Sequence, residues 1–261
     1  MSALIHVHIE DHIQTITLNR PEKKNAFNSQ MIGEWVQALE DAQNNKDVHV
    51  VVVTGAGDVF CAGGDVGDMQ EGKPTRLDAK NMLWEDIHRI PFTLQRMDKP
   101  VIAAINGPAV GAGLDMALMA DIRTMADTAK VSEGYVKVGL VPGDGGAYFL
   151  PRLVGEARAY ELLWTGRFVD AEEALQMGLV NHVFPRETFM EQTMDLARQI
   201  ASGPQIAIRM IKRSVRQSMK TDLETALDLI SSHMAIVTET EDHKEGVNAF
   251  LEKRKPKFTG R

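Results

Sequence analysis

The chain has 261 residues, a length that suits one large domain or two small ones and can bury a substantial core. Hydrophobic residues make up 44% and charged residues 25% of the sequence, which disfavours a disordered chain and a coiled coil, and the net charge of −7 argues against binding to nucleic acid. Cys61 is the only cysteine, so no intramolecular disulfide can form. Since no leader pattern or long apolar run is present either, we expect a cytoplasmic protein that does not bind membranes.

The N-terminal segment predicts a β-hairpin. Residues 4–9 and 13–18 are enriched in β-branched residues with partial alternation, and a short polar turn separates them. Asn28 then has the position of a helix N-cap before an amphipathic run that ends near Asn44. A hairpin followed by one helix is therefore expected at the start of the chain.

Two apolar runs, residues 48–54 and 100–106, are typical of strands buried on both faces. A helical pattern over residues 76–97 lies between them, which indicates a parallel crossover. Beyond residue 142 the periodicity is mostly helical, over residues 158–165, 171–177, 187–200, 204–219 and 223–237. The sequence predicts an α/β core with a helical C-terminal third.

Two glycine-rich loops, residues 60–65 (FCAGGD) and 106–113 (NGPAVGAG), follow these strands. Neither belongs to a G-x-G-x-x-G dinucleotide motif, and the chain has no P-loop and no G-x-S-x-G motif. Small residues let backbone N–H groups approach a ligand closely, so we expect both loops to meet at one ligand oxygen and to continue into helices. Tight turns without a ligand are the alternative interpretation.

Two aspartates are candidate catalytic groups. Asp115 is the polar residue of the apolar segment 114–120, so its carboxylate is expected to be buried and either paired, capping or functional. Asp144 lies among glycines in residues 139–146, where it is either a turn residue or a second catalytic carboxylate. The histidines form no H-E-x-x-H cluster, so no metal site is expected, and Cys61 is interpreted as a small buried hydrophobe.

In this order, the motifs resemble those of the crotonase superfamily, the enoyl-CoA hydratases and isomerases. The match covers essentially the whole chain and consists of NRP at 19–21, NA at 25–26, FCAGGD at 60–65, NGPAVGAGLD at 106–115, GLVPGDGG at 139–146 and FLEKR at 250–254. The resemblance implies an α/β fold, the crotonase (ClpP-like) spiral of ββα units, over residues 1–195. It also implies a helical C-terminal trimerisation region over residues 196–261, and hence a homotrimer or a homohexamer built as a dimer of trimers.

The resemblance further implies an acyl-CoA thioester substrate and no cofactor other than the coenzyme A of that substrate. The N–H groups of Gly64 and Ala112 would form an oxyanion hole. Coenzyme A would lie near a set of residues that includes two from a neighbouring subunit's C-terminal region. This set is Lys23, Lys24, Ala26, Ala62 and Asp65, with Phe250 and Lys253 reaching the site of a neighbour.

One position departs from the family pattern. The family's hydratases use two glutamates, and Asp115 and Tyr135 stand at those positions here. Glu133 lies two residues before the second position. A small loop shift could bring it to the site, but two residues is a large displacement for a group that must meet a proton within about 3 Å. Asp144 stands where some dienoyl-CoA isomerases carry a carboxylate. Asp115 and Asp144 are therefore the expected acid–base pair, while Glu133 and Tyr135 are candidate substrate contacts, unless the Tyr135 ring serves only to pack the core.

We expect an enoyl-CoA hydratase that adds water across the 2,3 double bond through an enolate. An enoyl- or dienoyl-CoA double-bond isomerase is the alternative enzyme. A non-enzymatic alternative is an acyl-CoA-binding scaffold protein, which would bind CoA esters without turnover. An RNA-binding role is opposed by the net charge of −7.

Overall fold

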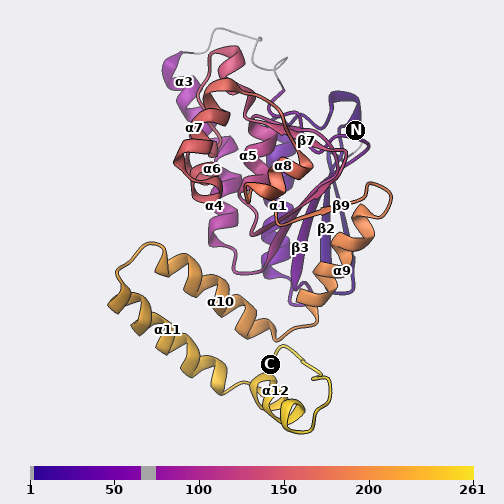
Figure 1. Cartoon of the computed structure of the whole chain (residues 1–261), viewed down its shortest axis with the longest axis vertical. Coiled ribbons are helices and arrows are strands. Elements are labelled where there is room, and N and C mark those ends of the chain that lie inside the picture. The colour runs from indigo at the N-terminus through magenta and orange to yellow at the C-terminus, as the bar shows by residue number, and fades with distance from the viewer. Residues whose placement is uncertain (1–2, 66–74) are drawn as a thin grey trace.

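Two β-sheets and the helices around them form the upper body of the protein, and three C-terminal helices form an arm below it (Figure 1). The computed structural model describes residues 3–65 and 75–261. Within these residues, the larger sheet has the order β1 (Ile5–Glu10), β2 (Ile13–Leu18), β3 (Val50–Gly55), β4 (Val101–Ile105), β6 (Ile122–Ala126) and β9 (His182–Phe184). The smaller sheet has the order β5 (Ala109–Val110), β7 (Lys130–Ser132) and β8 (Val169–Asp170).

The predicted hairpin is confirmed, because β1 pairs antiparallel with β2. Its turn uses Asp11 and His12, which both have positive φ angles, 50° and 63°, as a tight two-residue connection requires. From β2 onward the neighbours in the larger sheet are parallel, including the predicted pair β3 and β4. Every residue of β3 is buried, which explains its unbroken apolar sequence.

Helices cover the sheets and connect their strands. The predicted first helix α1 (Ser29–Asn44) is confirmed, and the Asn28 side chain caps it by accepting a hydrogen bond from the Met31 N–H. The other helices of the body are η1 (Pro21–Lys23), α3 (Arg76–Asn81), η2 (Met82–Ile87), α4 (Arg89–Arg96), α5 (Ala112–Leu118), η3 (Gly134–Val138), α6 (Gly146–Val154), α7 (Glu156–Thr165), α8 (Ala171–Gln176) and α9 (Phe189–Ala201). The helix expected directly after Asp65 falls outside the described residues.

The arm consists of α10 (Gln205–Ser218), α11 (Leu223–Thr238) and α12 (Glu241–Leu251) (Figure 1). The expected division after residue 195 falls inside α9, a continuous helix that contacts β2, β3, β4 and β6. The chain leaves the body after α9, at residues 202–204. No helix in the described part of the chain is long and apolar enough to cross a membrane.

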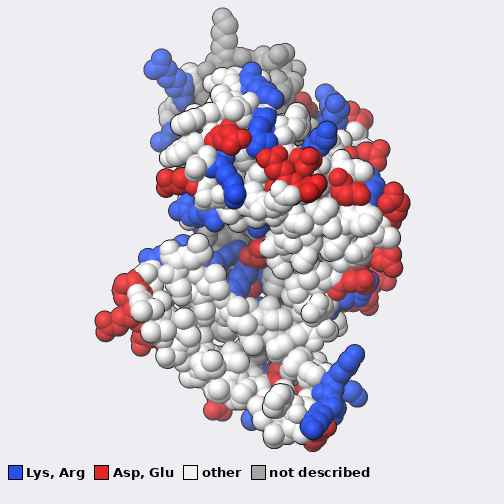
Figure 2. All heavy atoms as spheres, in the orientation of Figure 1, with Lys and Arg blue, Asp and Glu red and all other residues white. Residues whose placement is uncertain are grey.

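Ion pairs hold α10 against the body. The Asp98 carboxylate, only 5% exposed, binds Arg209 at 2.8 Å and Arg213 at 2.5 Å. Asp121 at the start of β6 binds Lys212 and Arg216 in the same way. The next helix, α11, contacts α10 but adds many exposed apolar side chains, and Figure 2 shows a broad uncharged face over both helices.

Candidate active site

The two glycine-rich loops lie side by side, as predicted. Cys61 and Ala109 form a parallel bridge, and the Val110 N–H donates to the Cys61 carbonyl at 3.0 Å. A Cβ atom at Gly113 would lie 2.1 Å from that carbonyl oxygen, so only glycine permits this approach. Burial raises the pKa of the Cys61 thiol to about 12, which agrees with its interpretation as a buried hydrophobe.

The backbone N–H groups of Gly64 and Ala112 come from these adjoining loops. A Cβ atom at Gly63, which has a φ of 102°, would lie 3.6 Å from the Ala112 nitrogen. Ala112 is the first residue of α5, where an N–H has no partner within the helix. No acceptor for either N–H is present among residues 3–65 and 75–261, so both groups are free to bind an oxygen atom.

Three elements bring two carboxyl groups to one phenol. Asp115 lies in the first turn of α5, Tyr135 in η3 and Asp144 in the loop before α6. The Tyr135 hydroxyl oxygen is 2.8 Å from Asp115 Oδ2 and 2.8 Å from Asp144 Oδ2. The Tyr135 ring also packs against the hydrophobic core, as one of the two predictions for this residue requires.

The two contacts of the Tyr135 oxygen need two protons. A phenol supplies one, which it donates to one carboxylate. The other contact is a hydrogen bond only if the second carboxyl is protonated and donates to the phenolic oxygen, because two lone pairs would otherwise face each other. Both contacts are therefore hydrogen bonds in the state in which Asp115 and Asp144 share one proton.

Glu133 extends this cluster. It stands two residues before the family's second glutamate position, yet its carboxyl group faces Gly146, as Asp115 Oδ1 does. A Cβ atom at Gly146 would lie 3.1 Å from each Glu133 carboxyl oxygen and 2.4 Å from Asp115 Oδ1. Glu133 lies between β7 and η3, and the chain there directs its side chain inward, toward Asp115. Glu133 is 1% exposed, and its oxygens have no hydrogen-bond partner among the described residues.

Burial changes the acidity of the whole cluster. It raises the pKa of Asp115 to about 6, although the Tyr135 hydrogen bond and the nearby Gly146 amide and Glu133 carboxyl act in the opposite direction. Burial also raises the pKa of Glu133 well above its usual value, and the charges of Asp115 and Asp144 raise it further. Burial and the neighbouring carboxylates thus favour the neutral form of Glu133.

The pKa of Asp144 is likewise raised by burial, against the effect of the Tyr135 hydrogen bond and the positive potential of His88. His88 Nε2 lies 2.8 Å from the carbonyl oxygen of Gly143. This contact ties the end of η2 to the loop that carries Asp144. Sequence reasoning gave no reason to select His88, because its partner is a backbone atom far along the chain.

Five of the expected coenzyme A contacts lie together near the first loop. Lys23 and Lys24 are exposed on the turn that follows β2, and the Ala62 N–H donates to the Lys24 carbonyl at 3.0 Å. Ala26 joins the same turn through a hydrogen bond from its N–H to the Lys23 carbonyl. The turn and the first glycine loop are therefore held as one surface.

Arg20 supports this surface and was not a predicted site residue. Its guanidinium donates to the Ala26 carbonyl at 2.6 Å and to Asp65 at 3.0 Å, and both charged side chains are about nine-tenths buried. Arg20 belongs to the NRP motif at residues 19–21, which the sequence analysis had noted. Its pairing with Asp65 could be assigned only from the tertiary structure. Removal of the Asp65 carboxylate would take the ionic partner from the buried Arg20 guanidinium.

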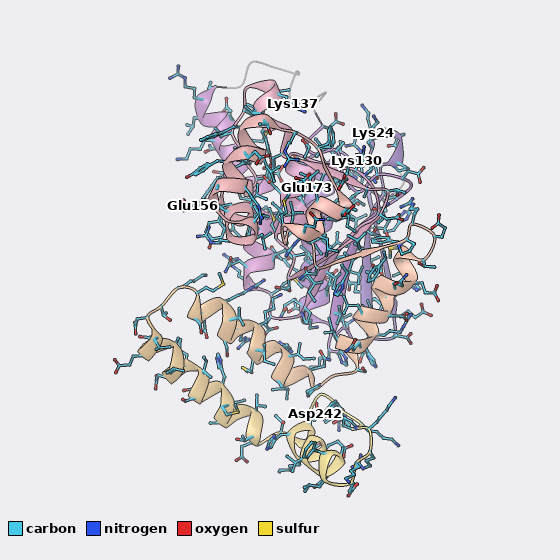
Figure 3. The ribbon with its side chains drawn as sticks, in the orientation of Figure 1. Lys24, Lys130, Lys137, Glu156, Glu173 and Asp242 are labelled. Atoms are coloured by element: carbon cyan, nitrogen blue, oxygen red, sulfur yellow. The ribbon has the colours of Figure 1, made fainter. Side chains whose placement is uncertain are left out.

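Phe250 and Lys253 lie elsewhere, at the end of the arm. Phe250 is 83% exposed, and Lys253 has a positive φ of 54° just after α12. Figure 3 places Lys24 on the body and Asp242, at the start of α12, at the opposite end of the molecule. Within one chain, these two expected contacts are not brought to the other five.

Solved structures of similar sequence share this architecture. Enoyl-CoA hydratase from Bacillus anthracis matches with a TM-score of 0.92 and 33% sequence identity, over 99% of this chain and 100% of that one. Enoyl-CoA hydratase from Mycobacterium smegmatis matches with a TM-score of 0.93 and 31% identity, over 98% and 99%. The fold is the crotonase fold, and the predicted fold class is confirmed.

The chain belongs to the enoyl-CoA hydratase/isomerase family, whose family model matches residues 8–261. It is 36% identical over 262 residues to the 1,2-epoxyphenylacetyl-CoA isomerase of Escherichia coli K12, with 100% of both chains covered. It is also 36% identical over 250 residues to the crotonyl-CoA hydratase of Syntrophomonas wolfei, with 95% of each chain covered. Hydratases and isomerases both occur among its similar relatives.

Proposed function

We propose that the protein is an enoyl-CoA hydratase that adds water across the 2,3 double bond of an enoyl-CoA thioester. The observation that carries this proposal is that Asp115, which meets Asp144 at the Tyr135 hydroxyl, lies one helical turn from the Ala112 N–H, a donor with no acceptor among the described residues. The thioester oxygen would accept hydrogen bonds from Gly64 and Ala112 as it gains charge. Such donors stabilise an oxyanion transition state by about 2.7–4 kcal/mol each.

The reaction needs one base and one acid. The ionised carboxylate of the pair removes a proton from water, whose oxygen attacks Cβ while the electron pair of the double bond moves to the thioester oxygen. The protonated carboxyl then donates to Cα as the enolate collapses. No cofactor beyond the coenzyme A of the substrate takes part in this proposed sequence.

The proposed coenzyme A site uses the surface formed by Lys23, Lys24, Ala26, Ala62 and Asp65. The exposed lysines supply positive charge for its phosphates. We include Phe250 and Lys253 as contributions from a neighbouring subunit in a homotrimer or a homohexamer. The exposed apolar side chains of the arm support such an assembly, because large apolar patches usually mark protein interfaces; they include Ile211, Val215, Leu223, Leu227 and Met234.

A specific observation favours double-bond isomerisation as the second candidate function. The Tyr135 oxygen lies 2.8 Å from a carboxyl oxygen of both aspartates, the position that a water molecule shared by two carboxyls would occupy. Isomerisation requires no such water. One carboxylate would remove a proton from one carbon, and the carboxylic acid would protonate another while Gly64 and Ala112 hold the enolate oxygen.

Mass spectrometry of reactions in H₂¹⁸O distinguishes these functions. The purified protein would be incubated with crotonyl-CoA and, separately, with a 3-enoyl-CoA. ¹⁸O at Cβ establishes hydration, whereas a shifted double bond without ¹⁸O establishes isomerisation and contradicts the hydratase proposal. Calorimetric binding of both thioesters without any turnover would support the scaffold alternative instead.

Two variants serve this experiment. Asp115→Asn should lower turnover by at least about 10²-fold, the usual contribution of an acid–base group, while leaving thioester binding largely intact. Asp41→Asn is the matched control, because Asp41 is exposed on α1 and only accepts a hydrogen bond from Gln37. Equal turnover in the two variants would show that Asp115 is not an acid–base group of the reaction.

A further inference from the structure

Each aspartate of the pair uses its two oxygens differently. Asp115 Oδ2 and Asp144 Oδ2 both contact the Tyr135 hydroxyl, whereas the two Oδ1 atoms are buried without a hydrogen-bond partner in the described part of the chain. Buried oxygens without partners are costly and call for an explanation. Tyr135 therefore joins the two carboxyls through one oxygen of each, the Oδ2 atoms.

An acid–base pair must be restored after each turnover. In hydration and in isomerisation alike, the carboxylate that acts as base ends with a proton and the carboxyl that acts as acid ends without one. Asp115 is 0% exposed and Asp144 is 5% exposed, so bulk water has little access to either group. The next turnover therefore requires a path for one proton between the two carboxyls.

We propose that the Tyr135 hydroxyl carries this proton from the spent base to the spent acid. The inference rests on the proposed acid–base function but holds for hydration and isomerisation equally. The O–H bond of the protonated carboxyl breaks as its proton passes to the phenolic oxygen. At the same time the phenolic O–H bond breaks and its proton passes to the other carboxylate, so one proton moves and Tyr135 ends neutral.

The surroundings of Tyr135 favour this exchange in a single step. Burial and the two neighbouring carboxylates raise the pKa of Tyr135 far above its usual value, so a free phenolate is unfavourable and the phenol gives up a proton only as it gains another. A Cβ atom at Gly111 would lie 3.7 Å from the Tyr135 ring, so the second loop borders the ring.

The other titratable groups facing the bridge offer no second path. Glu133 borders Asp115, but no hydrogen bond joins it to Tyr135 among the described residues. His88 contacts the Gly143 carbonyl rather than a carboxyl oxygen. Tyr135 is thus the group that touches both aspartates.

Tyr135→Phe tests the relay, because it keeps the ring and removes the oxygen. In rapid-quench experiments, we expect a burst of about one product per site, followed by turnover that is slower than the burst by on the order of tenfold or more. Small buffer acids that enter the site should accelerate the slow phase in the variant but not in the wild type. Tyr160→Phe, which removes the same oxygen from an exposed ring on α7, is the control and should show no burst.

Equal slowing of the first and later turnovers, with no buffer effect, would overturn the relay and leave Tyr135 as a positioning residue. A measurement without substrate distinguishes a wrong relay proposal from a wrong proposal for the enzyme's function. Infrared spectra of protein labelled with ¹³C-aspartate should show one carboxylic acid band at neutral pH, displaced in Tyr135→Phe and assigned with Asp115→Asn and Asp144→Asn. Two ionised carboxylates in the wild type would contradict the relay whether or not the protein turns over enoyl-CoA.

Discussion

Gly146 faces Asp115 so closely that no side chain fits between them. A Cβ atom at residue 146 would lie 2.4 Å from Asp115 Oδ1 and 3.1 Å from both carboxyl oxygens of Glu133. The first residue of α6 thus provides the space in which the two carboxyls meet. Gly146 is therefore needed for the space that it leaves beside the two carboxyls and not for a positive φ angle.

Gly146→Ala should therefore displace Asp115 and Glu133 and lower kcat by about 10²-fold, the usual contribution of an acid–base group. Overpacking should cost only about 1–3 kcal/mol of the free energy of unfolding. Steady-state kinetics and urea unfolding measure the two effects. Gly33→Ala is the matched control, because its Cβ meets no atom within 4 Å and should leave activity unchanged. Wild-type kcat in Gly146→Ala would show that the carboxyls tolerate displacement.

The activity should fall in acid because the reaction needs an ionised carboxylate. The pKa of Asp115, raised by burial to about 6, predicts that kcat/KM declines as the pH falls below about 6. The groups that face Asp115 are Glu133, Tyr135 and Asp144, with His88 beyond Asp144. In Tyr135→Phe this limb should move to higher pH, because the Tyr135 hydrogen bond lowers the pKa of both aspartates. A pH profile that stays flat down to pH 5 would exclude Asp115 as the base.

The same carboxylate should destabilise the folded protein at high pH. Because the folded-state pKa of Asp115 exceeds its unfolded value, its favourable contribution is fully present below about pH 4 and is lost as the pH rises through about 6. Asp115→Asn should thus exceed the wild type in free energy of unfolding by about 3 kcal/mol at pH 8, and the difference should vanish near pH 4. Urea unfolding at several pH values tests this, and Asp41→Asn should show no such gain.

Asp98 should have the opposite pH dependence in its contribution to stability. Burial would raise its pKa, but hydrogen bonds from Arg209, Gln43 and Arg213 and the charge of Arg209 lower it to about 2. The stability it provides is therefore present above about pH 4 and lost as the pH falls toward 2.

At pH 7, Asp98→Asn should lower the free energy of unfolding by about 2 kcal/mol, the scale of hydrogen bonds to charged groups. Proteolysis should then cut the connection between α9 and α10 more readily. Asp195→Asn is the control, since it breaks the exposed pair with Arg198, and exposed pairs contribute little. Equal effects of the two substitutions would show that Asp98 does not anchor the arm.

The sequence alone determined the features that depend on local patterns. Alternation and the turn after Ile9 defined the hairpin, the Asn28 cap and helical periodicity defined α1, and unbroken apolar runs defined β3 and β4. The small residues of the two loops indicated their contact, because only glycine at Gly113 permits the approach to Cys61. These features need only neighbouring residues, so periodicity and capping chemistry were sufficient.

Tertiary structure decided how the acid–base cluster is assembled. The sequence marked Asp115 and Asp144, but nothing in it placed one Tyr135 oxygen at 2.8 Å from both or turned Glu133 toward Asp115. Side-chain periodicity assigns a residue to a face of an element, whereas a hydrogen bond requires tenths of an ångström across elements joined by long loops. That precision arises only when the sheets, α5 and α6 pack against one another, and it also raises the pKa values of the carboxyls that packing buries.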